Sequence, residues 1–121
     1  MADILIIDDS PTETHKLKIL LEKIGHKVSD VSNGADGIAY AREHIPDLIL
    51  MDVVMPGLNG FQATRQLSRI EETKNIPVVI VTTKDQETDK VWGLRQGARE
   101  FITKPIDTET LNRVITQFVV A

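Results

Sequence analysis

The chain has 121 residues, 41% of them hydrophobic, which suits one domain with a packed core and excludes a disordered chain. It has no cysteine, which excludes disulfides and thiolate metal sites, and its net charge of −4 with no basic run argues against a nucleic-acid surface. No apolar stretch is long enough to cross a bilayer and no signal peptide is recognisable, so we expect a cytoplasmic protein without membrane insertion.

Strand-like apolar runs alternate with helical patterns along the chain. The strand-like runs are Ile4–Ile7, Lys27–Val31, Leu48–Met51, Val78–Val81 and Phe101–Thr103. The helical patterns cover residues 11–24, 35–39, 61–70, 86–96 and 111–118. Because each crossover between strands is as long as a helix, the strands are expected to pair in parallel, which predicts one doubly wound α/β domain over residues 1–121.

Two of the helices carry specific expectations. For the first, Ser10 as N-cap and Glu13 predict a capping box, and Gly25 ends the helix. Its apolar residues at helical spacing predict one buried face: Leu17, Leu20, Leu21 and Ile24. In the fourth, Val91 and Leu94 are expected to be buried.

The single tryptophan and the three histidines each allow a purely structural and a functional interpretation. Trp92 either covers the fourth helix as a partly buried side chain or contacts a partner, and the sequence leaves both open. His15, His26 and His44 share no strand end with the acids, so we expect them to be surface residues, neither ligands nor phosphodonors.

Polar side chains follow four of the predicted strands. They are Asp8, Asp9, Asp52, Thr82, Thr83 and Lys104. The carboxyl ends of parallel strands lie at one edge of the sheet, where doubly wound domains bind ligands, so we expect these groups to meet. Each alone is better explained as a cap, a turn or a β-forming residue, but four coincidences with complementary charge favour a site.

The chemistry of this group points to phosphoryl transfer. Carboxylates a few ångströms apart repel by roughly 1–4 kcal/mol per pair, which a divalent cation relieves. Because the available ligands are oxygens, they favour Mg²⁺. This ion is usually bound by one or two carboxylates together with phosphate oxygens, so a phosphoryl group is the expected substrate. Lys104 then supplies a positive charge, Thr82 a hydroxyl donor and Asp52 a nucleophilic carboxylate.

The segments ILIIDDS, LILMDVVMPGLNG, VVIVTT and FITKP resemble the receiver domain of two-component response regulators over essentially the whole chain. The resemblance implies a flavodoxin-like (βα)5 fold with strand order 2-1-3-4-5 and no output domain. It implies that Asp52 is the phosphoacceptor. It also implies that Mg²⁺ is held by Asp8, Asp9, Asp52 and the backbone carbonyl of Val54.

The same resemblance assigns further roles near the phosphoryl group. Thr82 and Lys104 are expected to contact it, and the Lys104–Pro105 peptide bond is expected to be cis. Thr82 and Phe101 are expected to act as the switch. The face formed by the fourth helix, fifth strand and fifth helix would then change its affinity for a downstream partner.

Two longer segments, MDVVMPGLNGFQATRQL and TTKDQETDKVWGLRQGAREFITKP, are similar to stand-alone PilH-type receivers of type IV pilus twitching-motility systems. Such receivers are served by a chemotaxis-like histidine kinase, which the resemblance implies as the phosphodonor. We expect a monomer or weak dimer that acts as a partner-binding switch or as a phosphate sink.

Four positions depart from the receiver pattern and bear on the lifetime of the phosphate. Phe101 has a ring but no hydroxyl, and Val54 cannot orient an attacking water. Lys84 either contacts the phosphoryl group or points into solvent, and Thr83 is larger than the alanine often found there.

Two other function classes share the same residues. A Mg²⁺-dependent phosphatase with an aspartyl-phosphate intermediate would need a lid or recognition insert and a general acid, which the sequence does not show. A pseudo-receiver that only binds partners would not need the acids together with Thr82 and Lys104. We therefore expect a signalling domain that is not an enzyme acting on external substrates.

Overall fold

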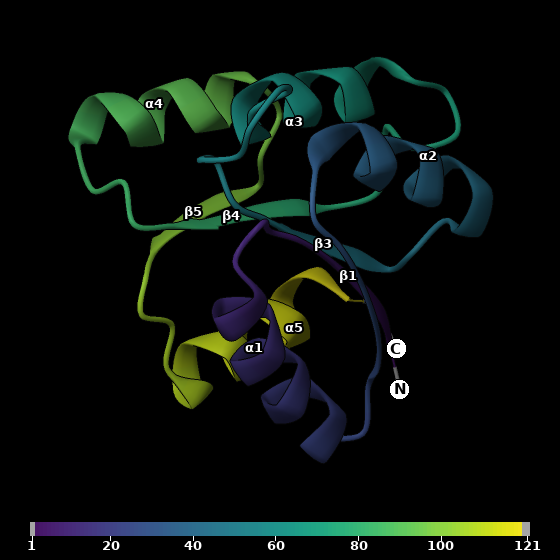
Figure 1. Cartoon of the computed structure of the whole chain (residues 1–121), viewed down its shortest axis with the longest axis vertical. Coiled ribbons are helices and arrows are strands. Elements are labelled where there is room, and N and C mark those ends of the chain that lie inside the picture. Colours follow the sequence, from purple (N-terminus) through teal and green to yellow (C-terminus); the bar gives the residue numbers. More distant parts are fainter. Residues whose placement is uncertain (1, 120–121) are drawn as a thin grey trace.

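The computed structural model describes residues 2–119, in which strands and helices alternate from β1 to α5 (Figure 1). The strands are β1 (Asp3–Ile7), β2 (Lys27–Val31), β3 (Leu48–Met51), β4 (Val78–Thr82) and β5 (Glu100–Thr103). The helices are α1 (Pro11–Lys23), α2 (Gly34–His44), α3 (Gly60–Arg69), α4 (Glu87–Arg95) and α5 (Thr108–Phe118). The predicted alternation is confirmed.

The strands form one parallel sheet in the order β2-β1-β3-β4-β5, as the receiver resemblance implies. Figure 1 shows α1 and α5 on one face of the sheet and α2, α3 and α4 on the other. Both faces of the central strands are therefore covered. The doubly wound α/β architecture is confirmed, and its carboxyl-terminal sheet edge is the place where such folds bind ligands.

The central strands are apolar throughout because each supplies side chains to two cores. In β1, Leu5 and Ile7 pack toward α2 and α3, whereas Ile4 and Ile6 pack toward α1 and α5. β3 divides its side chains in the same way, and all four of its residues are buried. This double burial explains why the strands lack an alternating polar pattern.

The start of α1 differs from the predicted capping box. Ser10 Oγ accepts a hydrogen bond from the Glu13 backbone N–H at 3.4 Å, so the N-cap is confirmed. The reciprocal contact from Glu13 was predicted wrongly, because the Ser10 N–H donates to Asp8 Oδ1 at 2.9 Å. The carboxylate two residues earlier takes the donor that a capping box would use.

The buried face predicted for α1 is confirmed only as far as Leu21. Leu21 is fully buried, and Leu17 and Leu20 are partly buried against the same core. Ile24 is 41% exposed, because the helix ends at Lys23 and Ile24 no longer follows the helical spacing. Gly25, with φ +92°, turns the chain after the helix as expected.

The orientation of α4 was predicted wrongly. Val91 and Leu94 are 46% and 49% exposed, while Gly93 is the residue buried against the sheet. A Cβ on Gly93 would lie 2.9 Å from Ile80 Cδ1 and 3.0 Å from Phe101 Cδ2. The glycine therefore lets α4 approach β4 and β5 closely, and the larger apolar side chains face outward.

No helix within the described part of the chain is long and apolar enough to span a bilayer.

Candidate functional site

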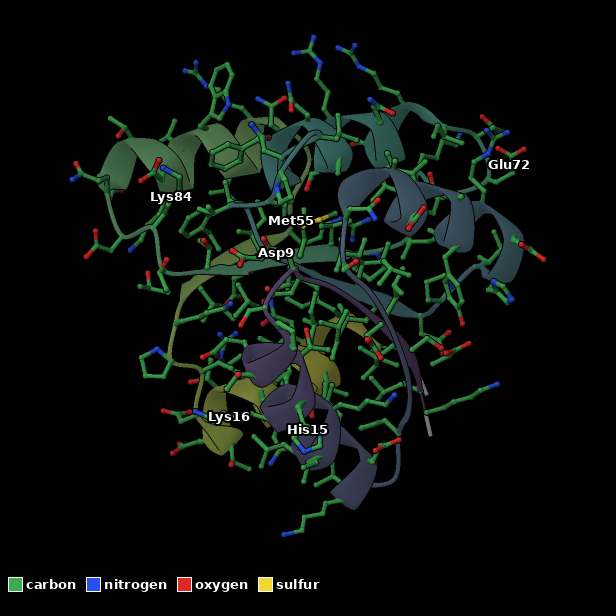
Figure 2. All side chains as sticks on the ribbon, viewed as in Figure 1. Asp9, His15, Lys16, Met55, Glu72 and Lys84 are labelled. Carbon is green, nitrogen blue, oxygen red and sulfur yellow. The ribbon has the colours of Figure 1, made fainter. Side chains whose placement is uncertain are left out.

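The carboxylates meet at the carboxyl-terminal edge of the sheet, as predicted. Asp8 follows β1 and Asp52 follows β3, and these strands pair with Ile7 opposite Met51. The Asp52 backbone N–H donates to the Ile7 carbonyl at 2.9 Å, which fixes the two acids side by side. One oxygen from each of Asp8, Asp9 and Asp52 lies within 4.8 Å of the others. Figure 2 shows Asp9 at this edge, between the two helical layers.

Lys104, the residue that follows β5, completes the group. Its Nζ lies 2.7 Å from Asp8 Oδ2 and 3.3 Å from Asp52 Oδ2. Its backbone N–H donates to the Thr82 carbonyl at 2.7 Å, which attaches the end of β5 to the end of β4. The expected cis Lys104–Pro105 bond is present. The ammonium group of Lys104 thus contacts both buried carboxylates, Asp8 and Asp52.

The electrostatics of the group follow from its burial. Burial raises the pKa of Asp8, and the charge of Asp52 acts in the same direction, while the hydrogen bonds from Lys104 and Ser10 oppose it. For Lys104, burial alone lowers the pKa, but the hydrogen bonds and charges of Asp8 and Asp52 outweigh it, so the pKa is raised. Lys104 is therefore charged at neutral pH and acts as the counterion of the acids.

Backbone donors orient both buried carboxylates. Asp8 Oδ1 accepts the Ser10 N–H and Asp52 Oδ1 accepts the Val53 N–H at 2.7 Å, which leaves Oδ2 of each acid toward Lys104. Neither contact was predicted from the sequence. An Asp with Ser two residues later is a turn pattern that signals the first of them.

Gly60 allows the first turn of α3 to pass directly against the loop that carries Asp52. A Cβ there would lie 2.1 Å from the Asp52 carbonyl oxygen and 2.7 Å from Val53 Cα. The Gly60 N–H donates to the Val53 carbonyl at 3.0 Å. Close approach is thus what this position requires, whereas Gly57, with φ +73°, makes the turn.

The other predicted site residues lie near the group without direct contact to the acids. Thr82 ends β4 and is fully buried, and its Oγ1 accepts the Lys84 backbone N–H at 3.4 Å. Phe101 is half-buried against the core behind it, and Val54 is 56% exposed. The Lys84 side chain lies 3.7 Å from Asp89 on α4, and Figure 2 shows it beside that helix.

The histidines only partly match the expectation of surface positions. His15 and His44 are exposed, but His26 is half-buried, and its Nδ1 accepts the Ala2 N–H at 3.0 Å. His15 also lines a hollow of about 300 Å³ together with Asp8 and Asp9. The first turns of α1 follow the acids directly in sequence, which is the signal that places His15 there. None of the histidines belongs to the carboxylate group itself.

The residues present fit a Mg²⁺ ion. All donors in the cluster are carboxylate oxygens, the ligand type that this hard cation prefers, and Asp9 is exposed where waters would complete the coordination. Asp8, Asp9 and Asp52 would hold the ion. The pKa of Asp8 is raised by burial and by the charge of Asp52, and the ion would relieve the repulsion between these two acids.

Comparisons with known proteins agree with this geometry. The family model described as "Response regulator receiver domain" matches residues 4–116. Protein PilH of Pseudomonas aeruginosa is 67% identical over 115 residues, which cover 95% of each chain.

Solved structures show the same fold. The chemotaxis protein CheY4 of Vibrio cholerae covers 98% of this chain and is itself covered to 99%, with a TM-score of 0.91 and 28% identity. The receiver domain of the sensor histidine kinase PA1611 from P. aeruginosa, solved with a magnesium ion in its active site cleft, has a TM-score of 0.90 and 26% identity over 97% of this chain and 96% of that one. With the family model spanning nearly the whole chain, this protein belongs to the response regulator receiver domain family.

Proposed function

We propose that Asp52 accepts a phosphoryl group from the phosphohistidine of a chemotaxis-like histidine kinase. An Asp52 carboxylate oxygen attacks the phosphorus, the P–N bond to the histidine breaks, and the released imidazole takes up a proton from solvent. The observation that carries this proposal is the position of Asp52 Oδ2, 3.3 Å from Lys104 Nζ and within the group of three carboxylates.

The chain supplies the remaining parts of such a site. Lys104, now paired with both acids, is placed to contact the incoming phosphoryl oxygens. Bound Mg²⁺ would neutralise charge on the carboxylates and on the phosphoryl oxygens. Among the described residues the Val54 carbonyl accepts no hydrogen bond, which supports its role as a further ligand. The long 3.4 Å contact of the Thr82 hydroxyl leaves that group ready to turn toward a phosphoryl oxygen.

The switch would act on α4, β5 and α5. Phe101 lies between the core and Gly93 of α4, so a change in its rotamer would alter how closely α4 packs on the sheet. Val91 and Leu94 are exposed on α4 and offer apolar contact area to a downstream partner. Both observations support this face as the one whose affinity changes on phosphorylation.

We place the chain in type IV pilus signalling, as a cytoplasmic stand-alone receiver. The identity of 67% with PilH over 95% of both chains supports this assignment. Its output would then pass through a partner protein, or it would drain phosphoryl groups from a shared kinase. Return of the parental twitching behaviour when this chain is expressed in a P. aeruginosa strain lacking PilH, with no rescue by Asp52→Ala, would support the placement. Equal rescue by Asp52→Ala would exclude a role for phosphorylation.

Phosphorylation is tested by intact mass. The protein is incubated with Mg²⁺ and acetyl phosphate, whose P–O bond breaks to release acetate. We expect one phosphoryl adduct that is absent from Asp52→Ala and from samples containing a chelator. Asp85→Ala removes an exposed acid from the loop after β4 and should retain the adduct. No adduct with any donor would indicate a pseudo-receiver, and rapid turnover of many phosphoesters a phosphatase.

A further inference from the structure

A second polar hollow lies between α3 and α4, and none of its lining residues belongs to the carboxylate group. It measures about 410 Å³, and we call it the α3–α4 hollow; it is lined by Arg65, Ser68, Arg69, Trp92, Arg95, Gln96 and Gly97. In a parallel α/β fold the helices run against the strands, so the C-terminal ends of α3 and α4 lie at the sheet edge opposite the carboxylates. Figure 1 shows both helices in the same layer.

The three arginines of the hollow have no acidic partner within the described residues. Each is exposed, and no ion pair involves Arg65, Arg69 or Arg95. The acids that follow α3 pair elsewhere, Glu72 with Arg42 and Glu71 with Lys74. Figure 2 shows Glu72 beyond the end of α3, beside α2. In a chain with a net charge of −4, three such arginines around one hollow form a locally positive surface, which is complementary to an acidic partner.

Trp92 gives the hollow an apolar side. Its side chain is 49% exposed, although tryptophan has more apolar surface to bury than other residues. Tryptophan and arginine together are the residues most enriched among those that dominate binding energies at protein interfaces. Of the two interpretations of Trp92, this arrangement favours contact with a partner.

The floor of the hollow is held in place. Ser68 Oγ lies 2.7 Å from the Gln96 carbonyl oxygen and 2.6 Å from the Thr64 carbonyl oxygen, and it can donate to either one. A Cβ on Gly97 would lie 2.3 Å from the same Ser68 oxygen, so the two helix ends are in close contact. A preformed hollow loses less entropy when it binds a partner.

The local backbone distinguishes an acidic peptide from a compact phosphate. Phosphate sites typically use backbone N–H groups at helix N-termini, whereas this hollow lies at two helix C-termini, where carbonyls carry partial negative charge. Several carboxylates spread along a chain can instead each pair bidentately with one guanidinium. We propose that the α3–α4 hollow binds an acidic segment of a partner protein, through Arg65, Arg69 and Arg95, with an apolar side chain on Trp92. This contact is separate from Asp52 and does not require its phosphorylation.

Trp92 fluorescence tests the proposal, because it is the only tryptophan in the chain. The probe is a synthetic peptide of alternating Asp, Glu and Leu, and its counterpart has Asn and Gln in place of the acids. We expect saturable binding of the acidic peptide alone, weakened about five- to tenfold by Arg65→Gln, Arg69→Gln or Arg95→Gln. Raising the ionic strength should weaken it further.

Lys16→Gln is the matched control, because it removes one positive charge from α1 on the other face of the sheet (Figure 2). It should bind the peptide as the wild type does. Inorganic phosphate, ATP and phosphatidylglycerol vesicles serve as the other anions. The proposal is overturned if the acidic peptide does not bind, if the Asn/Gln peptide binds equally, or if Lys16→Gln matches the arginine variants. It is also overturned if any of the other anions binds more tightly than the acidic peptide.

The same variants separate this proposal from the phosphorylation of Asp52. The arginine variants should keep the acetyl phosphate adduct, and Asp52→Ala should keep peptide binding. If the wild type forms no phosphoryl adduct but binds the peptide, only the phosphorylation proposal is overturned. If it forms the adduct but does not bind the peptide, only the proposal for the α3–α4 hollow is overturned.

Discussion

Lys104 is expected to stabilise the fold chiefly as the counterion of two buried acids, and Lys104→Met tests this. The substitution removes the charge but keeps an unbranched side chain. At an effective dielectric constant of about 20, contacts of 2.7 and 3.3 Å correspond to gross attractions of roughly 6 and 5 kcal/mol. Desolvation of the three groups and the opening of the site to solvent at Asp9 offset most of this. We expect a net loss of about 2–3 kcal/mol in the free energy of unfolding without a divalent cation.

The variant should also respond more strongly to Mg²⁺ and to pH. Because the cation replaces the missing positive charge, millimolar Mg²⁺ should restore more stability to Lys104→Met than to the wild type. Acidification should reduce the deficit, because protonated carboxylates need no counterion. With the pKa of Asp8 raised above its ordinary value of 3.8, the deficit should appear as the pH rises through that raised pKa and should be complete at neutral pH.

Urea unfolding followed by circular dichroism, with and without Mg²⁺, measures these effects. Lys16→Met is the control, because Lys16 is exposed on α1 and forms no ion pair among the described residues. It should change the free energy of unfolding by less than about 0.5 kcal/mol. The reasoning fails if Lys104→Met without Mg²⁺ is as stable as Lys16→Met, or if Mg²⁺ stabilises both variants equally.

Three further predictions concern packing and pH. Gly60→Ala places a methyl group against the backbone of Asp52 and Val53, so it should lower the free energy of unfolding in urea by more than about 3 kcal/mol and slow adduct formation. Gly57→Ala has open space around its Cβ and should lower it by about 1–2 kcal/mol. Equal losses in the two variants would contradict the close approach at Gly60. Gly93→Ala should cost about 1–3 kcal/mol, because Ile80 and Phe101 side chains must shift, and an unchanged unfolding midpoint would show that α4 packs less closely than described. Burial lowers the pKa of His26 below its ordinary value of 6.5. The neutral ring therefore contributes stability that is fully present above pH 6.5 and is lost as the pH falls through the lowered pKa. NMR titration of the His26 ring measures this pKa, and a value of 6.5 or higher would refute the prediction.

The fold and the centre of the site could be predicted because both depend on sequence order. Continuous apolar runs separated by helix-length segments define a parallel sheet, and the ends of its strands share an edge whatever the packing details. For this reason Asp8, Asp52 and Lys104, which are far apart in the chain, were expected at one place, and they are in contact there.

The features that were predicted wrongly depend on tertiary packing. Apolar spacing shows that a segment can be a helix, but in α4 it does not show which side faces the sheet. That side is decided by Gly93, because the absence of a side chain lets Ile80 and Phe101 fill the space. In the same way, the Ser10 N–H has two possible acceptors, Glu13 and Asp8, and only the structure shows that Asp8 takes it.

The way α4 faces the sheet would link the proposed phosphorylation site to the exposed surface of that helix. Thr82 Oγ1 accepts the Lys84 N–H at 3.4 Å, and the Lys84 side chain lies 3.7 Å from Asp89 in the first turn of α4. Both contacts are long and therefore weak, whereas a hydrogen bond from Thr82 to a phosphoryl oxygen would be charge-assisted and stronger. Phosphorylation would thus exchange a weak contact for a strong one at little cost. Because α4 exposes Val91 and Leu94, even a small displacement of its first turn would change the apolar surface offered to partners.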